Sequence, residues 1–256
     1  MERVGRIGRP GRSIERFVTS VGSIMVLGDS LSYYDETGGL PSDDPRIWPN
    51  LVGEQVGREV DLFARIGWTS RDVWWAITQD PRIWAALPKA DVLVLAFGGM
   101  DSLPSPLPTA LREQIRYLRP ARLRQVVRDG YSWLQPRLSP LGWPMALPVA
   151  VTVDYFEKIR GAVAHLRPDL PIVVCLPSTH DSPYYGHAHP GRVPLTSAIG
   201  RWAHEHGIAT TTGFYEVTSA AYDDPDAVMN PDGIHWSVDA HAAIADAVAP
   251  VIRAAL

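Results

Sequence analysis

The sequence predicts an α/β fold of three layers, with a parallel central sheet between two layers of helices. Short apolar segments bounded by Gly, Pro or Asp recur along the chain, which is typical of buried strands. Segments with helical periodicity separate them, and strands that alternate with helices form parallel sheets covered on both faces. In such a sheet the ligand site lies beyond the carboxyl ends of the strands.

The predicted elements follow one another from residue 23 to the end of the chain. Strands are predicted at 23–27, 60–66, 92–97 and 172–176, with a weaker fifth at 208–212. Helices are predicted at 47–57, 70–78, 153–166 and 196–206, and a last helix follows residue 237. The order of these elements is the strongest indication of the fold.

Residues 102–150 do not follow this alternation. The segment is rich in proline and arginine, and we interpret it as a helical cap inserted over one end of the sheet, with two short helices broken at Pro120. Six arginines fall close together, at 112, 116, 119, 122, 124 and 128. They form either a solvated helix face or a docking site for an anionic substrate, which guanidinium groups bind bidentately.

The composition excludes several classes of protein. The chain has 256 residues, 46% of them hydrophobic, and a net charge of −4, which suits one globular domain and not a general nucleic-acid binder. Cys175 is the one cysteine, so neither a disulfide within the chain nor a thiolate zinc site can form. We expect no membrane span, because no apolar run is long enough. We also expect no metal.

The first residues differ in composition from the rest of the chain. Residues 1–17 contain five arginines among glycines and lack the apolar core of a secretory signal. We predict a flexible basic tail there, one folded domain over 18–256, and a cytoplasmic location. The sequence assigns no oligomeric state.

Two separated motifs together predict a catalytic domain. Ser30 follows the first predicted strand in the triplet Gly-Asp-Ser, where its hydroxyl needs a base to become a nucleophile. Asp232 and His235 lie three residues apart, just before the last helix. At that spacing Asp232 can orient the imidazole of His235, and His235 can act as general base toward Ser30. Either motif alone is commonly a turn or a helix cap, but the pair predicts a Ser30–His235–Asp232 triad.

With two further motifs, these residues resemble the SGNH (GDSL-type) hydrolase superfamily. The motifs are Arg65-Ile66-Gly67-Trp68-Thr69-Ser70 and Phe97-Gly98-Gly99-Met100-Asp101, each at the end of a predicted strand. The resemblance implies a three-layer hydrolase fold and an oxyanion hole that uses the backbone N–H groups of Ser30 and Gly67. The superfamily's third donor is an asparagine side chain, but Met100 stands at that position and a thioether cannot donate. Our hypothesis is that a backbone N–H near Gly99, or a group from the inserted segment, replaces it.

Longer segments resemble the actinobacterial diglucosylglycerate octanoyltransferases. They are residues 38–50, 65–82, 98–105 and 127–140, and Met100 lies inside one of them. The resemblance implies transfer of an octanoyl group to a glucosyl hydroxyl of diglucosylglycerate, in methylglucose lipopolysaccharide synthesis. It also implies an acyl-CoA donor as a substrate, a glucosylglycerate-type acceptor and no cofactor.

Several side chains next to these motifs are candidates for substrate contact. Trp68 follows the oxyanion glycine and Trp236 follows the general base, and aromatic faces can line an acyl chain or stack on a glucose ring. Asp101 flanks the third motif, where we expect it to hold a backbone turn, and it is also a candidate for substrate contact. The histidines at 180, 187 and 189 fall in a Gly/Pro-containing loop and receive no role in the chemistry.

Two other functions remain open at this point. The same triad would serve a carbohydrate esterase or deacetylase, and Met100 would also suit a carbohydrate- or lipid-binding protein with a relict site. Ser32 and Ser102 are rival nucleophiles, but neither directly follows a strand.

Overall fold

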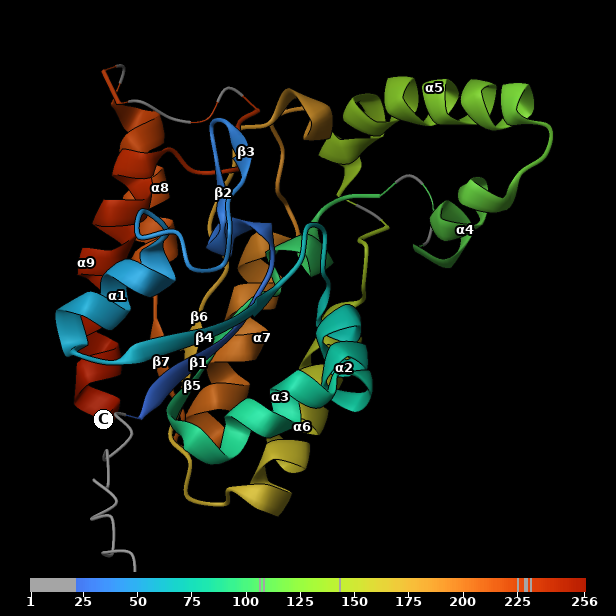
Figure 1. Ribbon diagram of the computed structural model, residues 1–256. Helices are drawn as coiled ribbons and strands as arrows, with labels where there is room; N and C mark the ends of the chain where they lie inside the picture. Colours follow the sequence, from blue (N-terminus) through green and yellow to red (C-terminus); the bar gives the residue numbers. More distant parts are fainter. Residues whose placement is uncertain are drawn as a thin grey trace, which may run out of the picture.

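The computed structural model describes residues 22–256 except 106, 108, 143, 225, 228, 229 and 231. Within them a five-stranded parallel sheet has the order β4-β1-β5-β6-β7 (Figure 1). The strands are β1 Ser23–Gly28, β4 Glu59–Ala64, β5 Ala90–Ala96, β6 Ile172–Cys175 and β7 Ala209–Thr211. All five predicted strands are therefore confirmed, with ends that differ by one or two residues. The predicted basic tail lies outside the described residues.

Helices cover both faces of the sheet, as the alternation of elements predicts. One layer contains α1 Trp48–Val56, α8 Gly213–Asp223 and α9 Val238–Ala255, and the other contains α2 Ser70–Gln79, α3 Pro81–Ala86, α6 Val149–Leu166 and α7 Arg192–Glu205. Sequence analysis did not predict α3 or α8. Successive side chains of a strand point to opposite faces, so Ile24 and Val26 pack under the first layer while Met25 and Leu27 pack under the second.

A short antiparallel hairpin follows β1 at the carboxyl edge of the sheet. It pairs β2 Tyr34–Asp35 with β3 Gly38–Gly39. The buried ring of His241 holds this hairpin to the body: its Nδ1 accepts from the N–H of Trp48 at 3.2 Å, and its Nε2 lies 3.0 Å from the carbonyl oxygen of Tyr34. Both nitrogens of His241 are thus satisfied by the backbone.

The inserted segment forms α4 Thr109–Gln114 and α5 Ala121–Leu138, which we call the α4–α5 arm. The break at Pro120 is confirmed, but α5 is 18 residues long, so the prediction of two short helices is wrong. Figure 1 shows α5 extending sideways from the body, beyond the carboxyl edge of the sheet. That this arm caps the sheet stays a prediction.

The end of α5 nearest the body is the part that is fixed. Gln135 is fully buried and donates from Nε2 to the carbonyl oxygen of Pro104 at 2.6 Å. A Cβ added at Gly186 would lie 2.3 Å from the carbonyl oxygen of Pro136, so the two backbones are in close contact. The arm is therefore joined to the loop between β6 and α7.

Candidate active site

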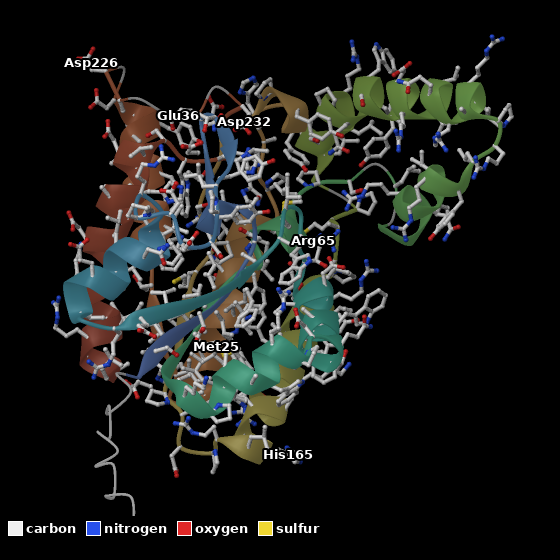
Figure 2. All side chains as sticks on the ribbon, viewed as in Figure 1. Met25, Glu36, Arg65, His165, Asp226 and Asp232 are labelled. Carbon is white, nitrogen blue, oxygen red and sulfur yellow. The ribbon has the colours of Figure 1, made fainter. Side chains whose placement is uncertain are left out.

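Three loops that leave neighbouring strands meet at the carboxyl edge of the sheet. β1 lies between β4 and β5, with Gly28 paired to Ala64 on one side and to Ala96 on the other. Ser30, Gly67 and Gly99 follow these strand ends at short spacing, so the register brings the three predicted motifs together. Figure 2 shows Arg65 and Asp232 at this end of the molecule and His165 at the opposite end.

Ser30 begins a single 3-10 turn directly after β1. Asp29 precedes the turn, and its carboxylate accepts from the N–H of Leu31 at 3.0 Å. A Cβ at Gly28 would lie 2.1 Å from the hydroxyl oxygen of Ser32, so a larger residue there would force that side chain to rotate. Ser30 is almost fully buried, and its hydroxyl makes no hydrogen bond to any described residue, so it is free to face a substrate.

Asp232 and His235 form the predicted acid–imidazole pair. Nδ1 of His235 lies 2.5 Å from Oδ2 of Asp232, while Oδ1 of Asp232 accepts from the N–H groups of Ile234 and His235 at 2.8 and 3.0 Å. Burial raises the pKa of Asp232, but these hydrogen bonds and the imidazole outweigh burial and lower the pKa below its ordinary value. The carboxylate is therefore ionised and fixes the tautomer that leaves Nε2 of His235 as the base.

The loop that carries His235 is held from two sides. Gly233 has φ of +70°, and its carbonyl oxygen accepts from the N–H of Asp181 at 2.9 Å and from the hydroxyl of Tyr222 at 2.8 Å. Asn230 donates to the carbonyl oxygen of Asp35 at 2.9 Å. These contacts tie the loop to the hairpin and to the loop after β6.

Nε2 of His235 is buried and has no hydrogen-bond partner among the described residues. It is thus not bonded to Ser30 in this structure, and catalytic hydrogen bonds commonly tighten only when substrate binds. The ring of Tyr34 lies against the imidazole, with centroids 4.5 Å apart. Tyr34 is a site residue that sequence analysis missed, since its proximity depends on the hairpin.

Asp29 is fully buried beside the nucleophile, and this burial raises its pKa to about 7. The hydrogen bond from Leu31 works in the opposite direction but is weaker, and the nearby charge of Asp101 adds to the rise. Asp29 therefore changes its charge near neutral pH, unlike an ordinary carboxyl group.

Asp101 supports the site from behind and does not line it. Its fully buried carboxylate accepts from the N–H and the hydroxyl of Ser70 and from the hydroxyl of Thr152, the last at 2.9 Å. It thereby joins the start of α2, just after Gly67, to α6. Burial raises the pKa of Asp101 to about 6, against these hydrogen bonds. The contacts of the Asp101 carboxylate are therefore structural, which corrects the prediction that it binds substrate.

The two tryptophans beside the motifs have different positions. Trp236 is completely buried, packed edge-on against Phe214 and His241, so the prediction that it contacts substrate is wrong. Trp68 lines an open groove of about 610 Å³ together with Phe63, Arg65 and side chains of the α2–α3 turn. Substrate contact by Trp68 stays a prediction.

A narrow cavity opens next to Ser30, with a volume of about 30 Å³. Gly99, Met100, Leu31, Leu103 and Ile234 form its apolar wall. His180 and His189, from the loop after β6, also line the cavity. Sequence analysis assigned these histidines no role, because nothing in the spacing of the residues shows that this loop folds over the end of β1.

Ser102, a rival nucleophile, also contacts a histidine. Its hydroxyl oxygen lies 2.8 Å from Nε2 of His189 and donates to the carbonyl oxygen of Gly99 at 2.9 Å. Burial lowers the pKa of His189 to about 3, which makes it a weak base. Ser102 is buried with its proton committed to a carbonyl, so Ser30 is the better placed nucleophile.

Among the described residues, the backbone N–H groups of Ser30, Gly67 and Gly99 have no acceptor within the protein. All three follow the ends of adjacent strands, and Gly67 has a φ of +72°. Free N–H groups at this position are suited to an oxyanion. The oxyanion role of the three residues stays a prediction.

Two further searches cover the described residues only. No group of three or more His, Cys, Asp or Glu there could hold a metal ion. None of the helices in that part of the chain combines the length and the hydropathy needed to cross a membrane.

A parallel α/β sheet with Ser30 and the Asp232–His235 pair at its carboxyl edge is typical of serine-dependent acyl-transfer enzymes. The chain belongs to the GDSL-like lipase/acylhydrolase family, whose model matches residues 26–243. A lipase/acylhydrolase from Enterococcus faecalis has the same fold, with a TM-score of 0.59 at 15% identity over 91% of this chain and 96% of that one.

Two curated relatives are far more similar in sequence, and both are named diglucosylglycerate octanoyltransferase. The protein from Mycolicibacterium hassiacum is 55% identical over 225 residues, which cover 88% of this chain and 92% of the relative. The protein from Mycobacterium tuberculosis is 53% identical over 227 residues, which cover 88% of this chain and 89% of the relative. The resemblances carried by the sequence motifs are thereby confirmed.

Proposed function

We propose that this protein transfers an octanoyl group from octanoyl-CoA to a glucosyl hydroxyl of diglucosylglycerate, through an acyl-enzyme on Ser30. One combined observation carries the proposal: an unbonded serine lines a cavity, and an Asp-oriented histidine directly follows Ile234 of the same cavity, in a chain 53–55% identical to octanoyltransferases. The reaction belongs to methylglucose lipopolysaccharide synthesis, as the family resemblance implies.

Acylation uses Ser30 and His235 in sequence. Oγ of Ser30 attacks the thioester carbonyl carbon while its proton passes to Nε2 of His235, and the carbonyl electron pair moves onto oxygen. When the carbonyl re-forms, the carbon–sulfur bond breaks and the departing thiolate takes the proton from His235. The products are octanoyl-Ser30 and free CoA.

Transfer reverses these roles with a sugar hydroxyl as nucleophile. The hydroxyl gives its proton to His235 and attacks the ester carbonyl, and Ser30 leaves with that proton. Asp232 stabilises the imidazolium in both halves of the reaction. No proton or electron pair has to come from a cofactor.

The apolar wall beside Ser30 supports a place for the acyl chain. A cavity of about 30 Å³ holds about two water molecules, so an octanoyl chain must displace side chains to enter. Met100 is suited to this movement, because an unbranched thioether side chain adapts readily to its surroundings. This gives Met100 a reason to replace a polar residue.

The groove along β4 supports a place for the acceptor. Its volume of about 610 Å³ falls within the range of small-molecule sites. Trp68 offers an aromatic face, Gln79 offers an amide, and Arg65 offers a guanidinium for the glycerate carboxylate. Arg65 and Trp68 lie on either side of Gly67 in the sequence, and β4 lies across β1 from β5 and β6, so an acceptor in the groove would approach Ser30 from the β4 side.

The experiment follows thiol release from octanoyl-CoA with and without diglucosylglycerate, with mass spectrometry of the sugar. We expect acceptor-dependent release and an octanoylated sugar, both lost in Ser30→Ala, and a raised acceptor KM in Arg65→Gln. Thiol release at the same rate with and without the sugar, with free octanoate as the product, would identify an esterase instead. Tight sugar binding without any turnover would identify a binding protein.

A further inference from the structure

Two histidine rings form one wall of the cavity beside Ser30. His180 and His189 stack with centroids 4.6 Å apart and planes inclined by 33°. The cavity they share with Ser30 and Met100 holds about two waters, so its walls lie within a few ångströms of one another. An acyl group attached to Ser30 therefore comes within reach of these rings.

The protonation of His180 is fixed by its backbone partner. The N–H of Ser182 donates to Nδ1 of His180 at 3.2 Å, so Nδ1 carries a lone pair and the proton of the neutral ring sits on Nε2. Burial lowers the pKa of His180 to about 4, which keeps the ring neutral at physiological pH. His180 is thus a neutral N–H donor.

That donor has no partner among the described residues, although Nε2 of His180 is buried. His241 shows the contrast, since both of its ring nitrogens are bonded to the backbone. A buried donor without an acceptor has lost the hydrogen bonds that it would make in water, which is unfavourable. A substrate oxygen in the cavity would satisfy it.

His189 cannot supply the same hydrogen bond. The single hydroxyl proton of Ser102 goes to the carbonyl oxygen of Gly99, so Nε2 of His189 donates to Ser102 and Nδ1 is left without a proton. The unpartnered Nδ1 of His189 is therefore an acceptor. Of the two rings, only His180 presents an N–H group.

We propose that Nε2–H of His180 donates a hydrogen bond to the carbonyl oxygen of the acyl group on Ser30, and so provides the side-chain oxyanion donor that Met100 lacks. The inference rests on the proposed function only in requiring acyl transfer at Ser30, whatever the acceptor. As charge develops on that oxygen, the hydrogen bond strengthens, and Ser30 and Gly67 contribute their backbone N–H groups.

The loops of the two catalytic histidines are joined directly. Asp181, the residue after His180, donates its N–H to the carbonyl oxygen of Gly233, two residues before His235. The position of the donor is therefore coupled to the position of the base. The imidazole is neutral in this role, because burial disfavours its charged form.

The test compares variants that keep or remove a donor at the ε position. His180→Gln places an amide N–H near Nε2, His180→Asn places its amide near Nδ1, and His180→Phe keeps only a ring. The readout is the rate of acylation, measured as thiol release in a single turnover with octanoyl-CoA and as nitrophenol release from p-nitrophenyl octanoate. His204→Phe is the matched control, an exposed histidine near the carboxyl end of α7.

We expect acylation to fall about 10²–10³-fold in His180→Phe and His180→Asn, with KM nearly unchanged. His180→Gln should retain at least a tenth of the wild-type rate, and the control should stay within about 3-fold. Adding Met100→Asn to His180→Phe should restore part of the lost rate, because an asparagine amide then supplies the donor. Melting temperatures show which variants fold, and His180→Asn serves if the phenylalanine variant does not.

Three results would overturn the inference. One is a loss of less than about 5-fold in both donor-free variants, and another is a large gain for Met100→Asn alone, which would mean that no side-chain donor is in place. The third is normal acylation with a defect only in transfer to the sugar, which would make His180 an acceptor-binding residue. Nitrophenol release without any reaction of octanoyl-CoA would contradict octanoyl-CoA as the acyl donor, but the role of His180 would still be tested with the nitrophenyl ester.

Discussion

Among the residues of the site, Asp29 is the carboxyl group that changes its charge closest to neutral pH. Its carboxyl has a pKa of about 7 in the folded protein because it is buried, against about 3.9 for a free side chain. Below pH 4 the group is protonated in both states and costs no stability. As pH rises from 4 to 7 the unfolded state ionises first, so the free energy of unfolding decreases, and above pH 7 the loss is complete.

Asp29→Asn should remove this loss of stability. Its amide oxygen can still accept from the N–H of Leu31, and the neutral side chain has no charge to desolvate. The unfolding free energy of the variant relative to wild type should rise by a few kcal/mol between pH 4 and pH 8, at about 1.4 kcal/mol per pKa unit. Denaturant titrations at several pH values measure it, with exposed Asp169→Asn as control. A difference that does not change with pH would contradict the burial argument.

At the scale of elements, the loop that carries His235 depends on one glycine. Gly233 has a positive φ, and a Cβ there would lie 2.3 Å from the carbonyl oxygen of Asp181. The contact cannot be relieved by rotating a side chain, because the obstacle is backbone. The loop would have to move, and with it both Asp232 and His235.

Gly233→Ala should therefore reduce kcat by about 10–100-fold, since small displacements of a catalytic group have large effects on rate. Gly207→Ala is the matched control: Gly207 has φ of +65° but open space around its Cβ position. Both variants should lose similar stability from the backbone strain. Equal activity in the two would show that the Asp181 contact does not position His235.

The strands could be predicted because a strand of a parallel sheet is buried on both faces and reads as a continuous apolar run. Residues 24–27, for example, are all buried. The triad could be predicted because Ser30 follows such a run and because Asp232 and His235 are close in sequence. Gly67 and Gly99 could be placed near Ser30 because each of them also lies just after a predicted strand.

Other features depend on tertiary contacts that leave no local pattern. His180 and His189 reach Ser30 only because the loop after β6 is tied to Gly233 and to the end of α5. Trp236 looks like a substrate contact because it neighbours His235, yet its ring turns into the core beside Phe214. The helix α8 was missed because its apolar face is short: its buried residues are Gly213, Phe214 and Thr218.

At the scale of the whole molecule, the proposed site has two approaches to one serine. The apolar cavity lies between the loops after β1, β5 and β6, and the polar groove lies along β4 and the α2–α3 turn. Separate approaches suit an enzyme that binds its acyl donor and its sugar acceptor in turn. The α4–α5 arm brings Arg112 near the loop after β6, where its guanidinium acts to lower the pKa of Tyr184 and Tyr185. Burial of the two phenols outweighs this effect and raises both pKa values.

The most direct measurement is the mass of the intact protein after incubation with octanoyl-CoA, with peptide mapping of the product and then addition of diglucosylglycerate. We predict a mass increase of one octanoyl group on Ser30 that persists without acceptor and disappears when the sugar is added, as octanoylated diglucosylglycerate forms. An octanoyl group on another residue such as Ser102, or an adduct that decays to free octanoate equally fast with and without the sugar, would contradict the transferase mechanism.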